Sequence, residues 1–223
     1  MKLLRICMVV LGVVLGSQAL GLAAELIKLP PPSLKGAMSV EEALSQRRSV
    51  RQFANRGLDM PQVAQLLWAA SGVTDPGGKR TAPSGRAAYH LEFYLVAGER
   101  GVSQLPAGVY RYHPKEHSLE QVGKGDQRGP VAKAANNQAY LTQAPIIVVI
   151  AGEYARSKAK NSERGVRYTI MEAGLAGENL LLQTVALGLG AGCVGGFNDA
   201  EVSRALSLPR EHEPLLILPL GYK

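Results

Sequence analysis

The segment that most constrains the fold is Val166–Leu189, which carries apolar residues around most of the circumference of a predicted helix. A helix that is apolar on all sides is normally buried. A stripe of small residues runs along it at Ala173, Gly174, Ala176 and Gly177. Such a stripe allows a second helix to approach closely, either within the subunit or across a dimer. Other parts of the molecule must therefore cover this helix.

Shorter patterns predict the other elements. Ser39–Glu42 is a capping box that predicts a helix from Val40 to about Arg47, and Asp59 with Pro61 begins a second helix that ends at Gly72. Further helices are expected at 130–139 and 199–206, and strands at 91–97, 109–113, 118–122, 145–151 and 214–220. Residues 190–196 are expected to form a short strand that leads into a turn. The order of these elements predicts an α+β fold, a three-layer sandwich with a mixed central sheet flanked by helices.

Length and composition indicate one globular domain. The chain has 223 residues, of which 46% are hydrophobic and 19% charged, and a chain of this length usually forms one domain. The net charge is +7, and it falls to +5 if Lys2 and Arg5 are removed with an export signal. This surplus is consistent with a phosphate-bearing ligand. No run of five basic residues occurs, so nucleic acid is not an expected partner.

The N-terminus has the pattern of an export signal. Two positive charges in Met1–Arg5 precede an apolar stretch, Ile6–Leu15, and a region of small residues, Gly16–Ala24. This order predicts a cleavable signal peptide at residues 1–24 and a periplasmic location. The alternative is a membrane anchor, since no charge interrupts 6–24. Residues 25–38 contain three consecutive prolines and are expected to be an extended spacer before the domain at 39–223.

Three segments could hold a ligand. Arg47, Arg48, Ser49 and Arg51 combine guanidinium groups with a hydroxyl, which suits phosphate oxygens, although a solvated basic helix end has the same composition. The Pro83–Gly85 loop could offer backbone donors to a planar ligand, or could be an ordinary turn. The glycine-rich stretch 188–196 follows a helix, whereas a dinucleotide fingerprint follows a strand, so it is interpreted as backbone that lies against a flat group.

Catalytic and metal-binding patterns are scarce. The four histidines lack metal-ligand spacing, so no metal site is expected and the catalytic residues remain unassigned. Glu172 and Glu178 are unusual on an apolar helix, because carboxylates are rarely buried without a partner. They could orient a ligand, or could pair with Arg164 and Arg167. Cys193, the one thiol outside the signal segment, is expected to be a small core residue.

Several of these motifs occur together in an order and spacing that resemble a known family. They are Arg47–Phe53, Leu66–Gly72, Arg80–Gly85, Gly108–Pro114, Glu172–Gly174 and Gly188–Phe197. This combination resembles the FMN-dependent nitroreductase superfamily, and within it the SagB-type branch of thiazoline and oxazoline dehydrogenases. The similarity extends from about Ser39 to Tyr222.

The resemblance implies a homodimer with FMN at the subunit interface. In such proteins the arginine-serine segment contacts the phosphate and ribityl chain, the proline-serine loop reaches the flavin from the other subunit, and the glycine turn lies against the ring. A basic residue after the last strand often completes the phosphate site. The residues that the resemblance assigns to FMN are therefore Arg47, Arg48, Ser49, Arg51, Pro83, Ser84, Gly85, Ala87, Gly195, Gly196 and Lys223.

The implied function is that of an exported FMN-dependent oxidoreductase. It would transfer electrons from NAD(P)H or another donor to a small planar acceptor by a ping-pong mechanism, and the flavin would carry the chemistry. The alternative is a non-catalytic protein that binds flavin or another planar ligand. Two positions depart from the branch: Lys160–Asn161 stands where azoline oxidases tend to have Lys-Tyr, and Glu178–Asn179 where the branch often has Gln-Asn.

Overall fold

Residues 26–223 are described by a computed structural model, and the predicted signal peptide lies outside them. The strands are β1 Leu26–Lys28, β2 Leu91–Ala97, β3 Gly108–His113, β4 Ser118–Lys124, β5 Ile146–Gly152, β6 Gly190–Ala191 and β7 Glu213–Gly221. The helices are α1 Val40–Gln46, α2 Met60–Ser71, α3 Arg128–Ala134, α4 Tyr140–Gln143, α5 Tyr154–Asn161, α6 Arg164–Ala186 and α7 Asp199–Leu206, with a short 3-10 helix at Gly85–Ala87. Among these described helices, none has the length and apolar character needed to cross a membrane.

The strands form one seven-stranded sheet in the order β1-β4-β3-β2-β5-β7-β6. Every pair of neighbouring strands is antiparallel. The expected mixed sheet is therefore corrected: among the described residues, parallel pairing is confined to isolated bridges that join Ser49 to Ala191 and Leu58 to Val102. The strands β2, β3 and β4 follow one another without an intervening helix, and connections of this kind favour antiparallel pairing.

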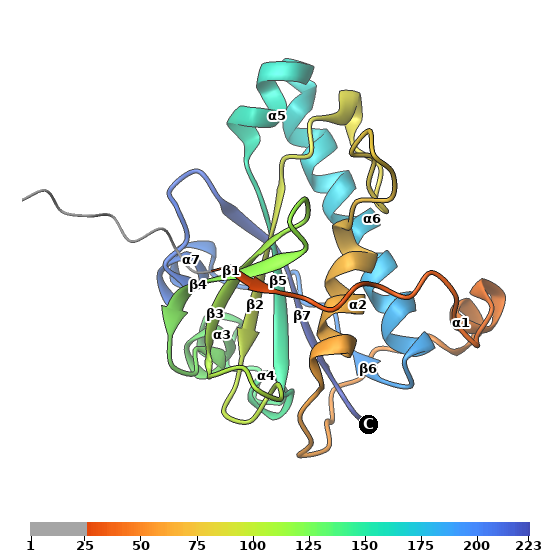
Figure 1. Cartoon of the computed structure of the whole chain (residues 1–223). Helices are drawn as coiled ribbons and strands as arrows, with labels where there is room; N and C mark the ends of the chain where they lie inside the picture. The colour runs from red at the N-terminus through yellow and green to blue at the C-terminus, as the bar shows by residue number, and fades with distance from the viewer. Residues whose placement is uncertain (1–25) are drawn as a thin grey trace, which may run out of the picture.

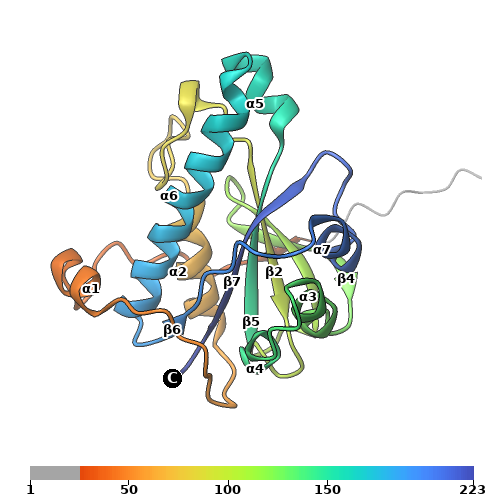
Figure 2. The same ribbon diagram turned by 180° about the vertical axis from the view of Figure 1, so that it is seen from behind.

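Helices cover both faces of the sheet, which confirms the three-layer α+β architecture. The views in Figures 1 and 2 place α2 and α6 together on one face and α3, α4 and α7 on the other. Each face has its own hydrophobic core. The central strand β5 is buried along its whole length, as its continuous apolar sequence predicts.

The helix α6 is buried along one side only. Of its small residues, Ala173, Ala176 and Gly177 are buried, whereas Gly174 is exposed. A Cβ atom added at Gly177 would lie 3.2 Å from the Leu216 side chain of β7. The buried small residues therefore allow α6 to pack closely against the sheet. The opposite side leaves large apolar residues exposed, with relative exposures of 55% at Ile170, 59% at Met171 and 47% at Leu175. The single chain thus covers only part of the apolar helix.

Both predicted helix starts are confirmed by their caps. The Ser39 hydroxyl accepts the Glu42 N–H at 3.1 Å, and the Glu42 carboxylate accepts the Ser39 N–H at 2.7 Å. Asp59 and Gln62 make the same reciprocal pair at the start of α2. These contacts satisfy backbone donors that the first turn of a helix leaves free.

One expected segment needs correction. The helix expected at 130–139 ends at Ala134, the last residue of α3, and α4 begins only at Tyr140. Between the two helices, Asn136 and Asn137 adopt left-handed backbone angles with φ of 57° and 58°. Asparagine tolerates this conformation better than most residues, and it does not continue a helix. The glycine-rich stretch forms the two-residue strand β6 and then turns, as predicted.

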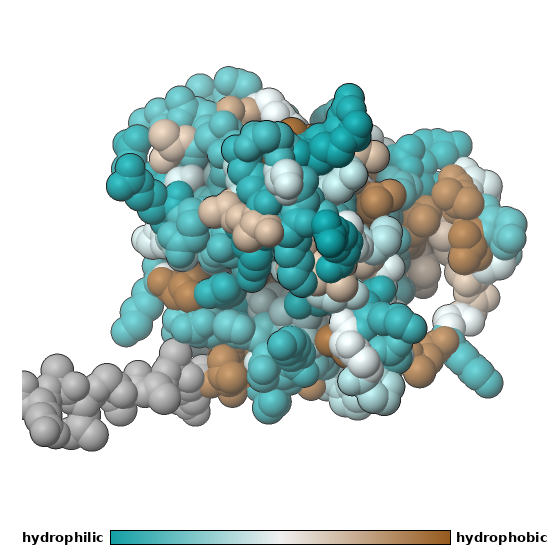
Figure 3. Space-filling view, turned by 90° about the horizontal axis from the view of Figure 1, so that it is seen from above, coloured by the Kyte–Doolittle hydropathy of each residue, from teal (hydrophilic) through white to brown (hydrophobic). Residues whose placement is uncertain are grey.

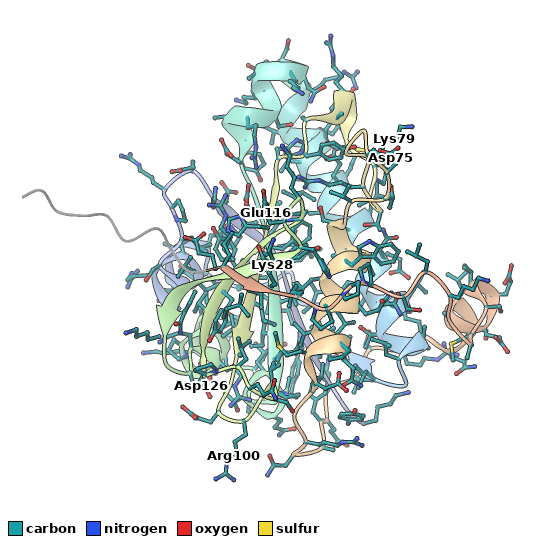
Figure 4. The ribbon with its side chains drawn as sticks, viewed as in Figure 1. Lys28, Asp75, Lys79, Arg100, Glu116 and Asp126 are labelled. Carbon is teal, nitrogen blue, oxygen red and sulfur yellow. The ribbon has the colours of Figure 1, made fainter. Side chains whose placement is uncertain are left out.

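Residues 26–38, the described part of the expected spacer, pack against the domain. The first of these residues form β1, which pairs with β4, and Leu29 is buried in the core. The Lys28 ammonium donates to the Glu116 carbonyl at 3.1 Å, and both residues are labelled in Figure 4. The three prolines keep the chain extended without preventing this pairing.

All four histidines lie fully or partly within the fold. His90 is completely buried and His212 is 5% exposed, while His117 is half-buried and contacts the Tyr112 hydroxyl at 2.9 Å. The His212 ring contacts the Tyr94 hydroxyl through Nδ1. Burial is the largest cause of a lowered pKa at these three histidines.

These lowered pKa values predict loss of stability in acid. An unfolded histidine binds a proton below about pH 6.5, whereas the folded environment resists protonation, so the free energy of unfolding falls as the pH drops from 6.5 toward the folded pKa. Each histidine contributes at most about 1.4 kcal/mol per pH unit. Urea unfolding at a series of pH values measures this slope.

The variant His212→Gln should flatten the slope because it removes one titrating group. Tyr94→Phe is the matched control: it removes the hydrogen bond but keeps the imidazole, so it should lower stability without flattening the profile. A free energy of unfolding that stays constant between about pH 7 and pH 5 would contradict the prediction.

Candidate functional site

Two of the predicted segments and the C-terminal residue meet at the β6 edge of the sheet. Val50 donates its N–H to the Ala191 carbonyl at 2.8 Å, so the chain after α1 runs beside β6. A Cβ atom added at Gly190 would lie 2.9 Å from the Val50 side chain and 3.0 Å from the Lys223 Cγ atom. Because Gly190 has no side chain, the segments that contain Val50 and Lys223 can both approach β6 closely. We call the group formed by Arg47, Arg48, Ser49, Arg51 and Lys223 the basic edge.

The cations of the basic edge are largely uncompensated. Arg48, Arg51 and Lys223 are exposed, and no ion pair joins any of them to a carboxylate within residues 26–223. The Arg48 guanidinium donates instead to the carbonyls of Ser45 and Arg47, at 3.1 and 2.7 Å. The Arg47 Nε atom lies 3.9 Å from a Glu178 carboxylate oxygen on α6. This edge is therefore suited to an anionic group.

The predicted glycine turn continues directly from the basic edge. Val194 exchanges two backbone hydrogen bonds with Ile217 of β7, at 2.8 and 3.0 Å, which fixes the start of the turn. The Asn136 side-chain amide donates to the Gly196 carbonyl at 3.1 Å. A Cβ atom added at Gly195 would meet nothing within 4 Å. Exposed backbone with open space above it could accommodate a flat ring.

Cys193 lies in this turn and is exposed, so the expectation of a core cysteine is wrong. It follows β6 at a point where the chain has reached the surface. Partial burial and the nearby Glu178 carboxylate both raise the pKa of its thiol. The thiol therefore stays protonated at neutral pH and is a poor nucleophile.

The predicted proline-serine loop lies elsewhere in the chain. Gly85 donates its N–H to Glu172 of α6 at 2.7 Å, and the Lys160 ammonium donates to the Ala87 carbonyl at 3.1 Å. Pro83 and Ala87 are exposed, and Ser84 is half-buried. In Figures 1 and 2 this loop accompanies the end of α6 next to α5, whereas β6 accompanies the opposite end. Its assignment to the flavin of a second subunit stays a prediction.

The two glutamates of α6 have different partners from those expected. Glu178 faces Arg47, and Glu172 faces the buried His90, with 3.2 Å between the nearest carboxylate oxygen and Nε2. Pairing with Arg164 or Arg167 is not observed for either glutamate within the described residues. Glu172 lies on the buried side of α6, so its partners come from the segments packed against that side.

Sequence reasoning missed a charged cluster beside the start of β2. The Glu92 carboxylate is bound by Arg111 at 2.9 Å and by Arg156, and Arg156 also pairs with Glu153 at 3.1 Å. Burial alone raises the pKa of Glu92, but the two guanidinium groups outweigh it and lower the pKa overall. The sequence signal for this cluster was Glu92, the one charged residue within the otherwise apolar strand β2, which needs charged partners when it is buried.

The same cluster contains three potential metal ligands. Side-chain atoms of Glu92, Glu153 and His212 lie within 4.8 Å of one another. Both carboxylates are already paired with arginine, however, and the Nδ1 atom of His212 contacts Tyr94. Since a cation would have to displace these partners, the cluster is better described as a structural ion-pair network.

Comparison with known proteins gives consistent matches. The model of the nitroreductase family matches residues 44–222. A Methanocaldococcus jannaschii protein described as "Putative nitroreductase" is 37% identical over 186 residues, which are 83% of this chain and 92% of that protein. The crystal structure of a Ralstonia eutropha protein of the same description superposes with a TM-score of 0.77 at 31% identity, covering 88% of this chain and 89% of the other.

A more distant relative is a protein that processes a microcin. The microcin B17-processing protein McbC of Escherichia coli is 27% identical over 169 residues, which are 74% of this chain and 62% of McbC. The family match spans most of the described residues. It includes the glycine turn and every residue of the basic edge except Lys223. This chain therefore belongs to the nitroreductase family of oxidoreductases.

Proposed function

We propose that this protein is an FMN-dependent oxidoreductase that holds the FMN phosphate at the basic edge and the flavin ring against Gly195 and Gly196. The observation that carries the proposal is the junction of these two features at β6. The segment with the exposed cations runs beside β6, and the open backbone of Gly195 follows β6 a few residues later in the chain. The family generally uses flavin, which supports the choice of cofactor.

The residues present fit such a cofactor. Arg48, Ser49 and Arg51 offer charged and neutral donors for phosphate and ribityl oxygens. Lys223 lies next to Gly190 and adds a further cation. Gly195 leaves free the space that any side chain would occupy. The fit is strongest at the phosphate end, where Arg48, Arg51 and Lys223 are exposed and have no carboxylate partner in the described chain.

The chemistry supplied by bound FMN would be two-electron transfer from NAD(P)H or another donor to a small planar acceptor, in two half-reactions that give ping-pong kinetics. The protein's own residues bind and orient the cofactor. The basic edge fixes one end of the cofactor, and the glycine turn leaves room beside the ring. This division of roles explains why the site needs no nucleophile or catalytic triad.

We also propose that two copies of the chain form the working enzyme. The Gly85 loop and the basic edge lie toward opposite ends of α6, with Glu172 and Glu178 about 9 Å apart along the helix axis. On its exposed side α6 carries Ile170, Met171 and Leu175. A second copy packed on these residues would cover the apolar surface and could bring its own loop to the basic edge.

A second apolar area supports the same contact. Val40 and Leu44 of α1 are exposed by 65% and 54%, and α1 packs beside α6. Figure 3 shows hydrophobic surface gathered on the side of the molecule where α1 lies. Apolar residues grouped on two adjacent helices are typical of a subunit interface.

Export is a separate proposal that rests on residues 1–24. Their charge and hydropathy pattern is that of a cleavable signal, so the mature protein is proposed to act in the periplasm. Sequencing the N-terminus of the protein recovered from a bacterial periplasm tests this: a start near Glu25 supports the proposal, and retention of Met1 in the membrane fraction contradicts it.

The cofactor proposal predicts a yellow protein whose FMN affinity depends on Arg48. Arg48→Ala should weaken FMN binding by about 1–3 kcal/mol, or roughly 5- to 150-fold in Kd, because it removes a charged donor. Flavin fluorescence titration measures this Kd. Arg210→Ala is the matched control, since Arg210 is exposed in the turn before β7.

Three outcomes separate the possibilities. A protein that takes up no added FMN contradicts the proposed function, and equal affinities in the Arg48→Ala variant and wild type contradict the phosphate assignment. A protein that binds FMN but reduces neither quinones nor nitroaromatics with NADPH or NADH would be a flavin-binding protein without turnover for these donors and acceptors.

The dimer proposal predicts that a charge on the exposed side of α6 separates the subunits. Leu175→Glu should convert the dimer into a monomer, because burying a carboxylate at an apolar contact is costly. Light scattering after size-exclusion chromatography gives the mass. The control Lys133→Glu changes an exposed residue of α3, on the other face of the sheet, and should stay dimeric. A monomeric wild-type protein would overturn the proposal.

A further inference from the structure

A buried carboxylate and a buried histidine meet beneath the Gly85 loop. Glu172 is 6% exposed and His90 is fully buried. One Glu172 oxygen accepts the Gly85 N–H at 2.7 Å, and the other lies 3.2 Å from the Nε2 atom of His90. One side chain of α6 thus connects the loop to the residue that precedes β2.

The His90 ring has little else to contact. Neither of its nitrogens has a well-directed hydrogen bond among the described residues, so Glu172 provides the one close polar group for Nε2. Burial lowers the pKa of His90 although the Glu172 charge opposes this shift. A neutral ring with its proton on Nε2 places this N–H beside the Glu172 carboxylate, although the contact lacks the geometry of a hydrogen bond.

The loop above this pair has an unfavourable backbone. Arg86, Ala87 and Tyr89 have positive φ angles of 55°, 50° and 44°, a region that costs energy for residues with a side chain. The Ser84 hydroxyl accepts the Tyr89 N–H at 2.9 Å and closes the loop on itself. The contact from Gly85 to Glu172 ties the closed loop to α6.

The loop also packs closely against α6 at Gly85. A Cβ atom at Gly85 would lie 3.1 Å from the Tyr168 ring and 3.5 Å from Glu172. On the outer side, Lys160 and Asn161 of α5 donate to the Ala87 and Gly85 carbonyls, at 3.1 and 3.4 Å. Lys160 is exposed and Asn161 is half-buried, whereas Glu172 is buried, so Glu172 is the most deeply buried side chain of the three that hold the loop.

We infer that Glu172, supported by His90, is a positioning residue that holds the Gly85 amide and thereby the conformation of residues 84–89. This inference rests on the proposed function in one respect: the loop so held is the one assigned to the flavin of the second subunit. Neither side chain is assigned to contact the cofactor. The pair acts through the loop that it holds.

Hydrogen exchange of the peptide that covers residues 82–90 tests the attachment without any cofactor. Glu172→Ala should speed exchange at the Gly85 amide by about tenfold or more, the range expected when a hydrogen bond to a charged group is lost. Glu172→Gln keeps an acceptor oxygen and should restore most of the protection. His90→Phe should give an intermediate rate, because it removes the support of the carboxylate but leaves the acceptor.

Glu163→Gln is the control, because Glu163 is exposed at the start of the same helix. Exchange in 82–90 should match wild type in this variant. A folded Glu172→Ala protein with wild-type exchange in 82–90 overturns the inference. So does faster exchange spread evenly over the whole chain, which would show a general loss of stability.

A second measurement uses the dimer loaded with FMN. Glu172→Ala should lower kcat for a quinone acceptor by tenfold or more, and Glu172→Gln should recover most of this loss. Equal kcat in wild type and Glu172→Ala overturns the role of the loop in turnover. If the protein binds no FMN, the proposed function fails, while the exchange experiment still decides whether Glu172 holds the loop.

Discussion

The contact between α6 and the sheet determines where the other parts of the site lie. It is possible because Ala173, Ala176 and Gly177 are small, so the helix axis comes close to β5 and β7. The same helix carries Glu172 toward the Gly85 loop and Glu178 toward Arg47. A larger residue at 177 would press on Leu216 and move both carboxylates together.

Electrostatics then distinguish the two glutamates of this helix. On the side of the Gly85 loop, the Glu172 carboxylate is enclosed with the neutral His90 ring and the Gly85 N–H, and its contacts are fixed by burial. On the side of the basic edge, Glu178 is 47% exposed and faces a single arginine, while the remaining cations are free in the described chain. Exposed ion pairs contribute little to stability. The surroundings of Glu172 are therefore suited to holding structure, and those of Glu178 to exchanging a ligand.

Much of the fold could be predicted from local sequence signals. The capping box at Ser39, the apolar run of β5 and the periodicity of α6 depend on neighbours in the chain, and each was confirmed. The end of α3 at Ala134, just before Asn136 and Asn137, was missed because asparagine is also tolerated within helices. The helix α5 was missed because it is short and mostly polar, so it has no apolar stripe to reveal it.

The candidate site shows the same limit more sharply. The basic segment was visible in the sequence, but its pairing with β6 depends on a backbone contact between Val50 and Ala191. The partners of Glu172 and Glu178 are His90 and Arg47, both remote in sequence. No periodicity connects such residues. The family resemblance supplied the grouping of the basic edge with the glycine turn, and it did not reveal the pair beneath the loop.

The basic edge is attached to the domain through main-chain atoms, since the hydrogen bond from Val50 to Ala191 involves no side chain. The side chains at 48, 49 and 51 project from this attachment into solvent. Anchoring of the segment and the proposed binding of an anion thus depend on different atoms. On this proposal, directed evolution can randomise these three positions to alter which anion is preferred, while the main-chain attachment remains intact.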